Sequence, residues 1–287
     1  MKELLTTRQV AQALGTSEAS LKRWCDRGRI PAVRTVGGHR RLPVNGVIQF
    51  LRQTGFPVAR PELLGLPPAV EGAGLSFERA RHDLRTALEA GDETTARQIV
   101  RGLYVSGHSV CTISDELIAP AFRDIGDRWR HGEIEVYEER RGCEVCMRVL
   151  LDLRKELPPA PADGPTAIGG TLEGDAYALP TLMAELVLRE EGWRAHSLGV
   201  GLPCETLAAA IRKERPRLFW LSVSAIANAE DFLVRYQKLY QTAAGWDCPI
   251  VVGGRALTRD IRRRMPYAAY GDNLLHLRSF ARSLRKT

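Results

Sequence analysis

Residues 4–42 read LLTTRQVAQALGTSEASLKRWCDRGRIPAVRTVGGHRRL. Thr6 or Thr7 can cap a first helix, because a threonine oxygen accepts a free amide proton of the first turn, and Gly15 can end that helix in a left-handed conformation. A second helix follows after a turn and runs to Trp24. This spacing predicts a helix-turn-helix, whose second helix enters the major groove of DNA.

A two-stranded wing is predicted after the second helix. Residues 33–36 and 39–42 flank Gly37 and Gly38, and basic residues gather at the tip of this hairpin. Contacts from the wing to phosphates would position the head, and the second helix would read the bases. The side chains predicted to contact double-stranded DNA are Thr16, Ser20, Lys22, Arg23, Arg34, His39, Arg40 and Arg41.

The excess positive charge lies in the same part of the chain. Residues 1–55 hold ten Lys and Arg against three acids, which accounts for the whole formal charge of +7 and leaves the remaining residues neutral. A basic head on a neutral body is the pattern expected of a protein that binds a polyanion.

Two proline-rich stretches, 55–74 and 158–170, divide the rest of the chain and cannot continue a helix. Between them, apolar residues recur at spacings of three and four. This periodicity predicts about four helices that pack as an antiparallel bundle.

After residue 165 short apolar strands alternate with helices, which predicts a parallel sheet covered on both faces, a doubly wound Rossmann-like layer. Ligands on such sheets bind beyond the carboxyl ends of the strands, and Tyr177, Ser222 and Gly253 fall there. The predicted strands are 167–171, 195–198, 218–224 and 249–252.

The predicted fold class is therefore multidomain. It comprises a winged helix-turn-helix DNA-binding domain at 1–55, a linker at 56–75, a four-helix bundle at 76–160 and a Rossmann-like α/β domain at 161–287.

Several classes of protein are disfavoured by the sequence. No stretch approaches the roughly 20 apolar residues of a membrane span, and the N-terminus lacks the pattern of a signal peptide. The six cysteines are scattered and do not suggest a disulfide framework. Cys143 and Cys146 form a single pair, which favours packing over a zinc site. With no phosphate-binding loop or catalytic triad visible, we expect a cytoplasmic protein that is not an enzyme.

The head resembles the winged helix-turn-helix of the MerR and excisionase families over about 50 residues. The wing of those proteins reads Gly-Gly-His-Arg, and Gly37, Gly38, His39 and Arg40 match it. Trp24 stands where they place a packing aromatic residue. The resemblance implies a regulator that binds double-stranded DNA.

The bundle and sheet resemble the cobalamin-binding module of corrinoid proteins and of light-sensing MerR-type repressors. That family carries an Asp-x-His-x-x-Gly loop, then Ser-x-Leu, then Gly-Gly. The resemblance implies a cobalamin-binding-like domain in which glycines and small serines leave a channel for the nucleotide tail of the cofactor. The matching ligand-binding residues are Asp175, Tyr177, Ser222, Ser224, Gly253 and Gly254.

The chain departs from this family at its metal ligand. Tyr177 replaces the histidine that binds cobalt, and Pro180 replaces the loop glycine. In the bundle, the light-sensing repressors cover the corrin with a tryptophan and a downstream Glu-His pair; here Trp129 and Glu139 match, and Arg140 replaces the histidine. Further ligand-binding candidates beside the tryptophan are Arg130 and His131.

Two interpretations of the cofactor remain open. The body holds an altered tetrapyrrole, which would be cobalamin without histidine ligation, haem or a bilin, or it holds none. A phenolate can bind ferric haem, and Arg130 or Arg140 could pair with the propionates of a bilin.

The resulting prediction is a transcription regulator whose body senses a ligand or light, changes its self-association as a homo-oligomer, and so controls operator binding. One alternative is a cofactor-free regulator whose body binds another protein. The other is a corrinoid carrier of an enzyme system, which would need the histidine that Tyr177 replaces.

Overall fold

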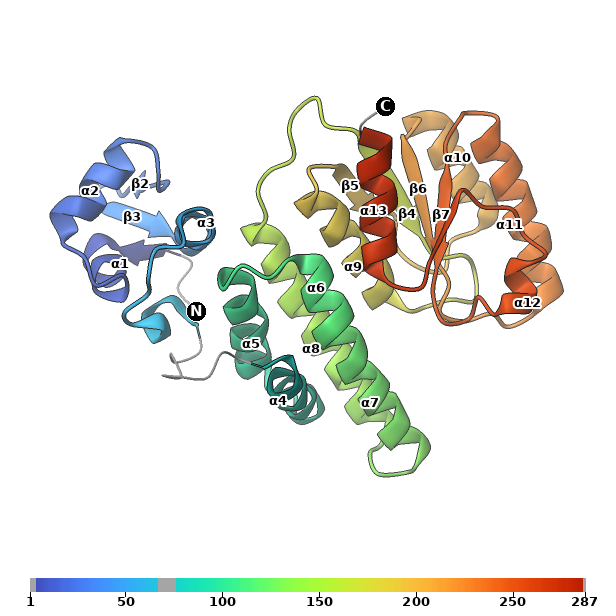
Figure 1. Ribbon diagram of the computed structural model, residues 1–287, viewed down its shortest axis with the longest axis horizontal. Helices are drawn as coiled ribbons and strands as arrows, with labels where there is room; N and C mark the ends of the chain where they lie inside the picture. The colour runs from blue at the N-terminus through green and yellow to red at the C-terminus, as the bar shows by residue number, and fades with distance from the viewer. Residues whose placement is uncertain (1–3, 67–75, 286–287) are drawn as a thin grey trace. The chain divides into compact units, whose positions relative to one another are not determined.

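The computed structural model describes residues 4–66 and 76–285. They form two compact units, and most of their helices and strands are labelled in Figure 1. One unit holds the chain up to Ser109 together with Glu116–Leu157. The other holds Val110–Asp115 together with the chain from Pro158 onward.

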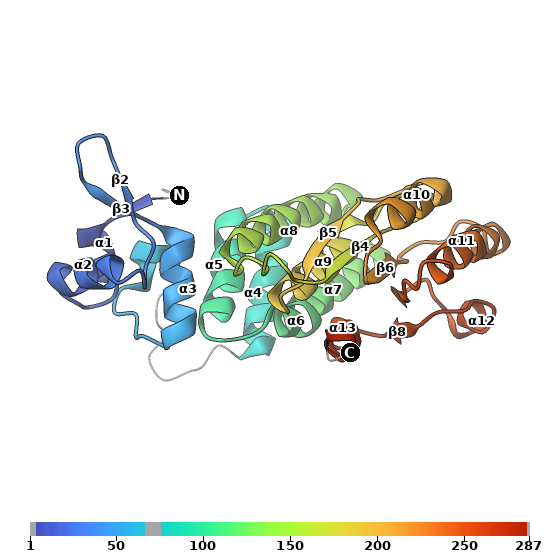
Figure 2. The same cartoon turned by 90° about the horizontal axis from the view of Figure 1, so that it is seen from above.

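Within residues 4–66, three α-helices and three short strands form a winged helix-turn-helix, as predicted (Figure 2). The helices are α1 (Thr7–Ala13), α2 (Glu18–Asp26) and α3 (Val44–Thr54). The strands pair antiparallel in the order β1 (Leu4–Thr6), β3 (Arg40–Pro43) and β2 (Val33–Arg34). The sequence reasoning missed β1 and α3.

Local side chains start the first two helices. The Thr6 hydroxyl accepts from the amide of Gln9, whose side chain accepts from the amide of Thr6 in turn. Ser17 accepts from the amide of Ser20 in the same way at the start of α2. These caps satisfy amide groups that no helical carbonyl can reach.

The small core of the head includes an aromatic cluster. The ring of Trp24 lies 5.1 Å from the ring of Phe50 and 5.1 Å from that of Phe56. The packing role predicted for Trp24 is therefore confirmed.

The proline-rich segment expected to be a linker begins as part of the head. Ala59 and Arg60 donate backbone hydrogen bonds to the carbonyl of Ala13, and a 3₁₀ helix, η1 (Pro61–Leu64), buries Leu64 against the head. Residues 56–66 thus pack against the helices of the head. The rest of the expected linker, 67–75, lies outside the described residues.

The bundle follows the helical periodicity. Its helices in the same unit are α4 (Phe77–Ala90), α5 (Glu93–Val105), α7 (Ala119–Arg130) and α8 (Val136–Glu156). Arg101 on α5 and Glu156 on α8 form an ion pair whose side chains are only 8% and 3% exposed. A buried charged pair of this kind links two helices at one point of the bundle interior.

Helix α3 of the head caps two bundle helices. The guanidinium of Arg52 donates to the carbonyls of Tyr104 and His108, at 2.6 and 2.7 Å, and lies over the ring of Tyr104. The side-chain amide of Gln49 donates to the carbonyls of Glu156 and Leu157. Carbonyl groups at the carboxyl ends of α5 and α8 and in the residues just after them thereby gain side-chain donors.

The second unit is built on a five-stranded parallel sheet ordered β5-β4-β6-β7-β8 within the described residues. The strands are β4 (Thr166–Gly170), β5 (Arg194–Ser197), β6 (Leu218–Ser222), β7 (Ile250–Gly253) and β8 (Ala269–Gly271). The prediction of a doubly wound sheet is confirmed, although β8 was missed.

Helices cover both faces of this sheet (Figure 1). One face packs on α9 (Ala178–Glu190) and α13 (Leu274–Arg285), and the other on α10 (Cys204–Glu214) and α11 (Ala229–Ala244). A short helix, α12 (Arg259–Arg262), lies between β7 and β8 in the chain.

A π-helical segment, Ser114–Ile118, follows the short helix α6 (Val110–Ile113). The Asp115 carboxylate accepts the amides of Leu274 and Leu275 at the start of α13, and the Glu190 carboxylate accepts the amide of Val110. These bonds hold α6 in the sheet unit.

Among residues 4–66 and 76–285, no helix has the length and apolar character needed to cross a membrane.

Candidate functional site

The second helix of the head presents polar side chains to solvent. Lys22 and Arg23 are exposed, and the guanidinium of Arg23 donates to the hydroxyl of Ser20. Thr16 lies half-buried just before α2, with its amide bonded to the carbonyl of Ala11. The structure therefore brings these four predicted DNA contacts onto the start and exposed face of one helix.

The wing is an exposed hairpin held by its own backbone. Gly38 has a φ of 75°, which a glycine adopts without strain. The Thr35 hydroxyl accepts from the amide of His39, and the Thr35 amide donates to the His39 carbonyl. Arg34 and His39 are exposed beside this turn, so both can reach a phosphate without displacing a partner among residues 4–66 and 76–285.

Arg40 is engaged inside the head. Its guanidinium lies 2.5 Å from the carboxylate of Asp26, the last residue of α2, and 3.1 Å from the carbonyl of Lys22 in the middle of that helix. The Arg40 side chain is only 21% exposed. Arg40 therefore joins the wing to the second helix, a role that the sequence did not suggest, because Asp26 lies in a different element. Arg41, next to it, is half-buried.

Asp175 organises the ligand-binding edge predicted for the sheet. Its side chain is buried, and its carboxylate accepts three backbone amides, from Tyr177 at 3.1 Å, Ser224 at 2.5 Å and Ala225 at 3.3 Å. The loop after β4 is thereby fastened to the loop after β6. A buried carboxylate with three donors is well satisfied, so Asp175 acts as a structural clamp in this geometry.

Tyr177 lies at the N-cap position of α9 and is half-buried. The guanidinium of Arg255 lies 5.1 Å from the centre of its ring and donates to the carbonyl of Ser224. The loops after β4, β6 and β7 therefore meet around these side chains. Arg255 was missed by the sequence reasoning, and no motif could have singled it out.

Gly253, the last residue of β7, and Gly254, which follows it, lie against neighbouring backbone. A Cβ on Gly254 would stand 2.2 Å from the carbonyl oxygen of Val223, and one on Gly253 would stand 3.0 Å from that of Gly271. Gly254 also has a φ of 123°. The absence of side chains here therefore serves the close approach of the protein's own strands and loops.

Gly169, near the centre of the sheet, lies against the side chain of Trp220. A Cβ on Gly169 would stand 2.2 Å from the indole of Trp220, which is 2% exposed. The indole nitrogen donates to the hydroxyl of Thr181 on α9 at 3.0 Å. Ser222, two residues further along β6, is also buried.

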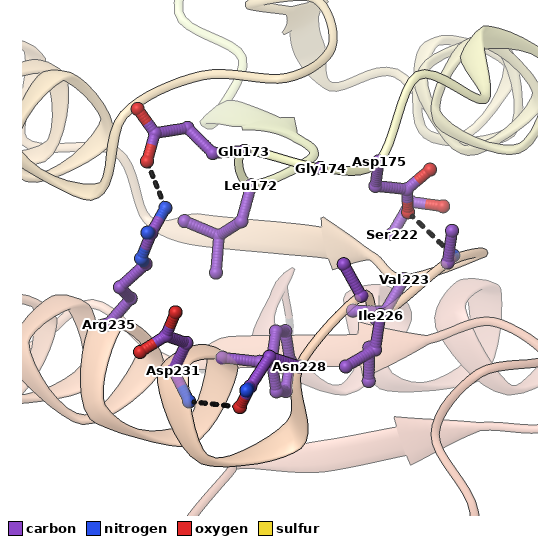
Figure 3. Close-up of a pocket in the computed structure, with 13 residues that line it drawn as sticks. Leu172, Glu173, Gly174, Asp175, Ser222, Val223, Ile226, Asn228, Asp231 and Arg235 are labelled. Carbon is purple, nitrogen blue, oxygen red and sulfur yellow. Dashed lines mark hydrogen bonds and ion pairs between the residues drawn. The ribbon is translucent and has the colours of Figure 1, made fainter.

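A cavity of about 240 Å³ opens between the loops after β4 and β6 and the start of α11 (Figure 3). An ion pair between Glu173 and Arg235 joins the two sides of this cavity. Asn228 accepts the amides of Glu230 and Asp231 and so caps α11. The volume lies below the roughly 300–1,000 Å³ of sites that hold drug-sized ligands.

The predicted bundle residues lie around the turn between α7 and α8. Trp129 is 45% exposed, and Arg130 forms an ion pair with Asp127. His131, the C-cap of α7, is exposed.

Glu139 and Arg140 lie on α8 near the thiol of Cys143. Burial, followed by the charge of Glu139, raises the pKa of that thiol to about 11, so the thiol stays protonated at neutral pH. In the part of the chain that the structure describes, no three His, Cys, Asp or Glu side chains form a group that could hold a metal ion.

Three stretches match known protein families. Residues 4–55 match a family described as a helix-turn-helix domain, and residues 80–152 and 165–273 match two families that are each described as a B12 binding domain. Over 271 residues the chain is 27% identical to the HTH-type transcriptional repressor CarH of Myxococcus xanthus. The alignment covers 86% of this chain and 87% of that protein.

One solved structure supports the fold of the body. The monomethylamine corrinoid protein of Methanosarcina barkeri superposes with a TM-score of 0.62 at 15% identity, over 74% of this chain and 100% of that chain. At this identity the likeness concerns the fold alone.

Proposed function

From the premise that this chain joins a helix-turn-helix domain to a cobalamin-binding-type module, we propose that it is a DNA-binding transcription regulator whose module senses a ligand and controls operator binding. The observation that carries the proposal is the exposed basic surface of α2 and the wing, on a chain whose sheet gathers three loops at its carboxyl edge.

The head would bind duplex DNA by two kinds of contact. Ser20, Lys22 and Arg23 on α2 would face base edges in the major groove, while Arg34 and His39 on the wing would meet phosphates. Paired heads would recognise a repeated or palindromic operator, because half-site spacing follows protein symmetry. The module would act by changing the self-association that brings two heads together, in a cytoplasmic homo-oligomer.

The signal is proposed to be a ligand or light received by the module, and the protein is proposed to have no enzymatic activity. A light response would require a bound chromophore, so a coloured preparation with a changed DNA affinity after illumination would support it. A colourless preparation that still regulates would favour the cofactor-free alternative.

The test of DNA binding uses the full chain and a random duplex library. We expect repeated selection to enrich a repeated or palindromic sequence, and Lys22→Ala to weaken binding to that sequence about tenfold, the effect of losing roughly 1.4 kcal/mol from one base contact. The matched control is Lys213→Ala, an exposed cation on α10 that should leave the affinity unchanged. Absence of any enriched sequence, or equal effects of the two variants, would refute the proposal.

Two wing variants distinguish an arginine that contacts phosphate from one that forms an ion pair within the head. Arg34→Ala should weaken binding to all duplexes about equally. It should also reduce the magnitude of the slope of log affinity against log salt by about 1, because the variant releases one counterion fewer from the DNA on binding. Arg40→Ala should also weaken binding to all duplexes but leave the slope unchanged, because Arg40 is held by Asp26. Anisotropy titrations at several salt concentrations measure both, and a flatter slope for Arg40→Ala would instead indicate that Arg40 contacts phosphate directly.

A further inference from the structure

Ser222 and Gly253, two of the residues expected to line a channel, share one face of the sheet with Trp220 and Gly169. Side chains alternate along a strand, and Ala167, Leu218, Trp220 and Val251 pack on the face covered by α9 and α13. Gly169, Ser222 and Gly253 each lie two residues after one of these positions, so they face the same side. The register pairs Gly169 with Trp220 and Ser222 with Gly253. A channel lined by these residues must therefore pass Trp220.

The indole of Trp220 fills the space over Gly169. A Cβ there would stand 2.2 and 2.4 Å from two ring carbons of Trp220, so the ring lies directly against the glycine. Trp220 also belongs to a buried cluster with Ala184 and Leu188 of α9 and Leu277 of α13. Sheet, indole and helices thus form one continuous core, with the ring between β4 and α9.

Polar contacts hold the ring in this position. The indole nitrogen donates to the Thr181 hydroxyl at 3.0 Å, and that hydroxyl lies 3.2 Å from the hydroxyl of Ser197 on β5. Trp220 and Thr181 are each 2% exposed. Moving the indole aside would leave its buried N–H without an acceptor, which opposes displacement by a ligand.

Cobalamin therefore does not fit this sheet with its nucleotide tail inserted. Trp220 lies two residues before the end of β6, so an opening on this face can extend about 7 Å inward before it meets the ring. The nucleotide base of cobalamin is a flat bicyclic group of nearly the size of an indole, and it would need the space that Trp220 occupies. The channel expected from the glycines and serines is thus blocked at Trp220, inward of Ser222 and Gly253.

We propose that Trp220 sets the ligand specificity of the module: it excludes corrinoids whose lower nucleotide must enter the sheet, and leaves only ligands that lack such a tail. This inference rests on the proposed sensing role of the module, but it concerns which ligand is admitted and is independent of whether the head binds DNA.

The test compares two corrinoids on the full chain. Cobalamin carries the lower nucleotide and cobinamide lacks it, so the ratio of their dissociation constants measures what the tail contributes. For the wild type we expect cobalamin to bind no tighter than cobinamide, measured by absorbance after gel filtration and by titration. Cobalamin binding that is tenfold tighter than cobinamide binding would overturn the proposal.

Variants at the same position test whether the indole is the excluding group. Trp220→Ala should gain at least tenfold in affinity for cobalamin while its affinity for cobinamide stays the same. Trp220→Phe, which keeps most of the ring, is the matched control and should behave as the wild type. A folded Trp220→Ala variant that gains no affinity for cobalamin would refute the assignment.

A measurement on the wild type covers the case in which Trp220→Ala does not fold. The ¹⁵N-labelled chain has five tryptophan indole groups, and the spectrum of Trp220→Phe identifies the signal of Trp220. We expect this signal to stay unchanged with millimolar cobalamin. Its shift or loss would show that the tail reaches the indole, against the proposal. DNA binding by the same preparation reports separately on the regulator function.

Discussion

Asp175→Ala should lower the free energy of unfolding of the sheet unit by about 3 kcal/mol, since three backbone amides lose their acceptor and each buried unsatisfied donor costs about 1–3 kcal/mol. Water can reach the more accessible of these amides, which keeps the loss near the lower end of the summed range. Urea denaturation followed by circular dichroism measures the change.

Two further variants at this loop make the test specific. Asp175→Asn keeps the shape and one acceptor oxygen but turns an NH₂ group toward a backbone amide, so its loss should lie between those of the wild type and Asp175→Ala. Glu173→Ala removes an exposed acid of the same loop, which pairs with Arg235, and should cost less than about 1 kcal/mol. Equal losses for Glu173→Ala and Asp175→Ala would contradict the clamp.

Arg101→Met should cost about 3–5 kcal/mol at pH 8, because it leaves the Glu156 carboxylate buried in the bundle without its partner cation. The double variant Arg101→Met with Glu156→Leu removes both charges and should recover most of the loss. Arg148→Ala, which breaks an exposed pair with Glu93, is the control and should cost less than about 1 kcal/mol.

The loss caused by Arg101→Met should depend on pH. Burial raises the pKa of Glu156 above its ordinary value of 4.5, although Arg101 opposes this shift. Without Arg101 the folded-state pKa rises further, so the folded variant binds the proton more tightly than the unfolded chain does. Stability of the variant therefore falls as the pH rises from 4.5 through the raised value. Urea titrations should give a smaller loss at pH 5 than at pH 8, and a loss independent of pH would contradict this account.

Local signals explain which parts of the fold the sequence could predict. The caps at Thr6 and Ser17 and the Gly37-Gly38 turn act within a few residues, so the helix-turn-helix and its wing were predictable. The apolar strands of the sheet were predictable for the same reason. By contrast, β8 holds only Ala269–Gly271, and its place at the sheet edge depends on pairing with β7, which no local pattern encodes.

The sequence could predict which loops lie at one edge of the sheet, but not the contacts between their side chains. Strand order placed Tyr177 at the carboxyl edge, the family resemblance added Asp175 and Ser224, and in the structure these three residues lie together. The sequence could not show that the Asp175 carboxylate accepts hydrogen bonds from three backbone amides. It also read residues 218–224 as a buried strand without revealing that Trp220 points at Gly169, because that depends on which face each strand residue takes and on the register with β4.

The capping of α5 and α8 by side chains of α3 has a consequence for how a signal could reach DNA. A guanidinium that holds the carbonyls of Tyr104, on α5, and of His108, just after α5, cannot move away without breaking both hydrogen bonds, so within this unit the DNA-binding head is fastened to the bundle. The helix that carries Arg52 follows the wing after Pro43, so a shift at the ends of α5 and α8 would tilt the hairpin as a lever. The bundle and the DNA-binding head would then be rigidly connected through α3.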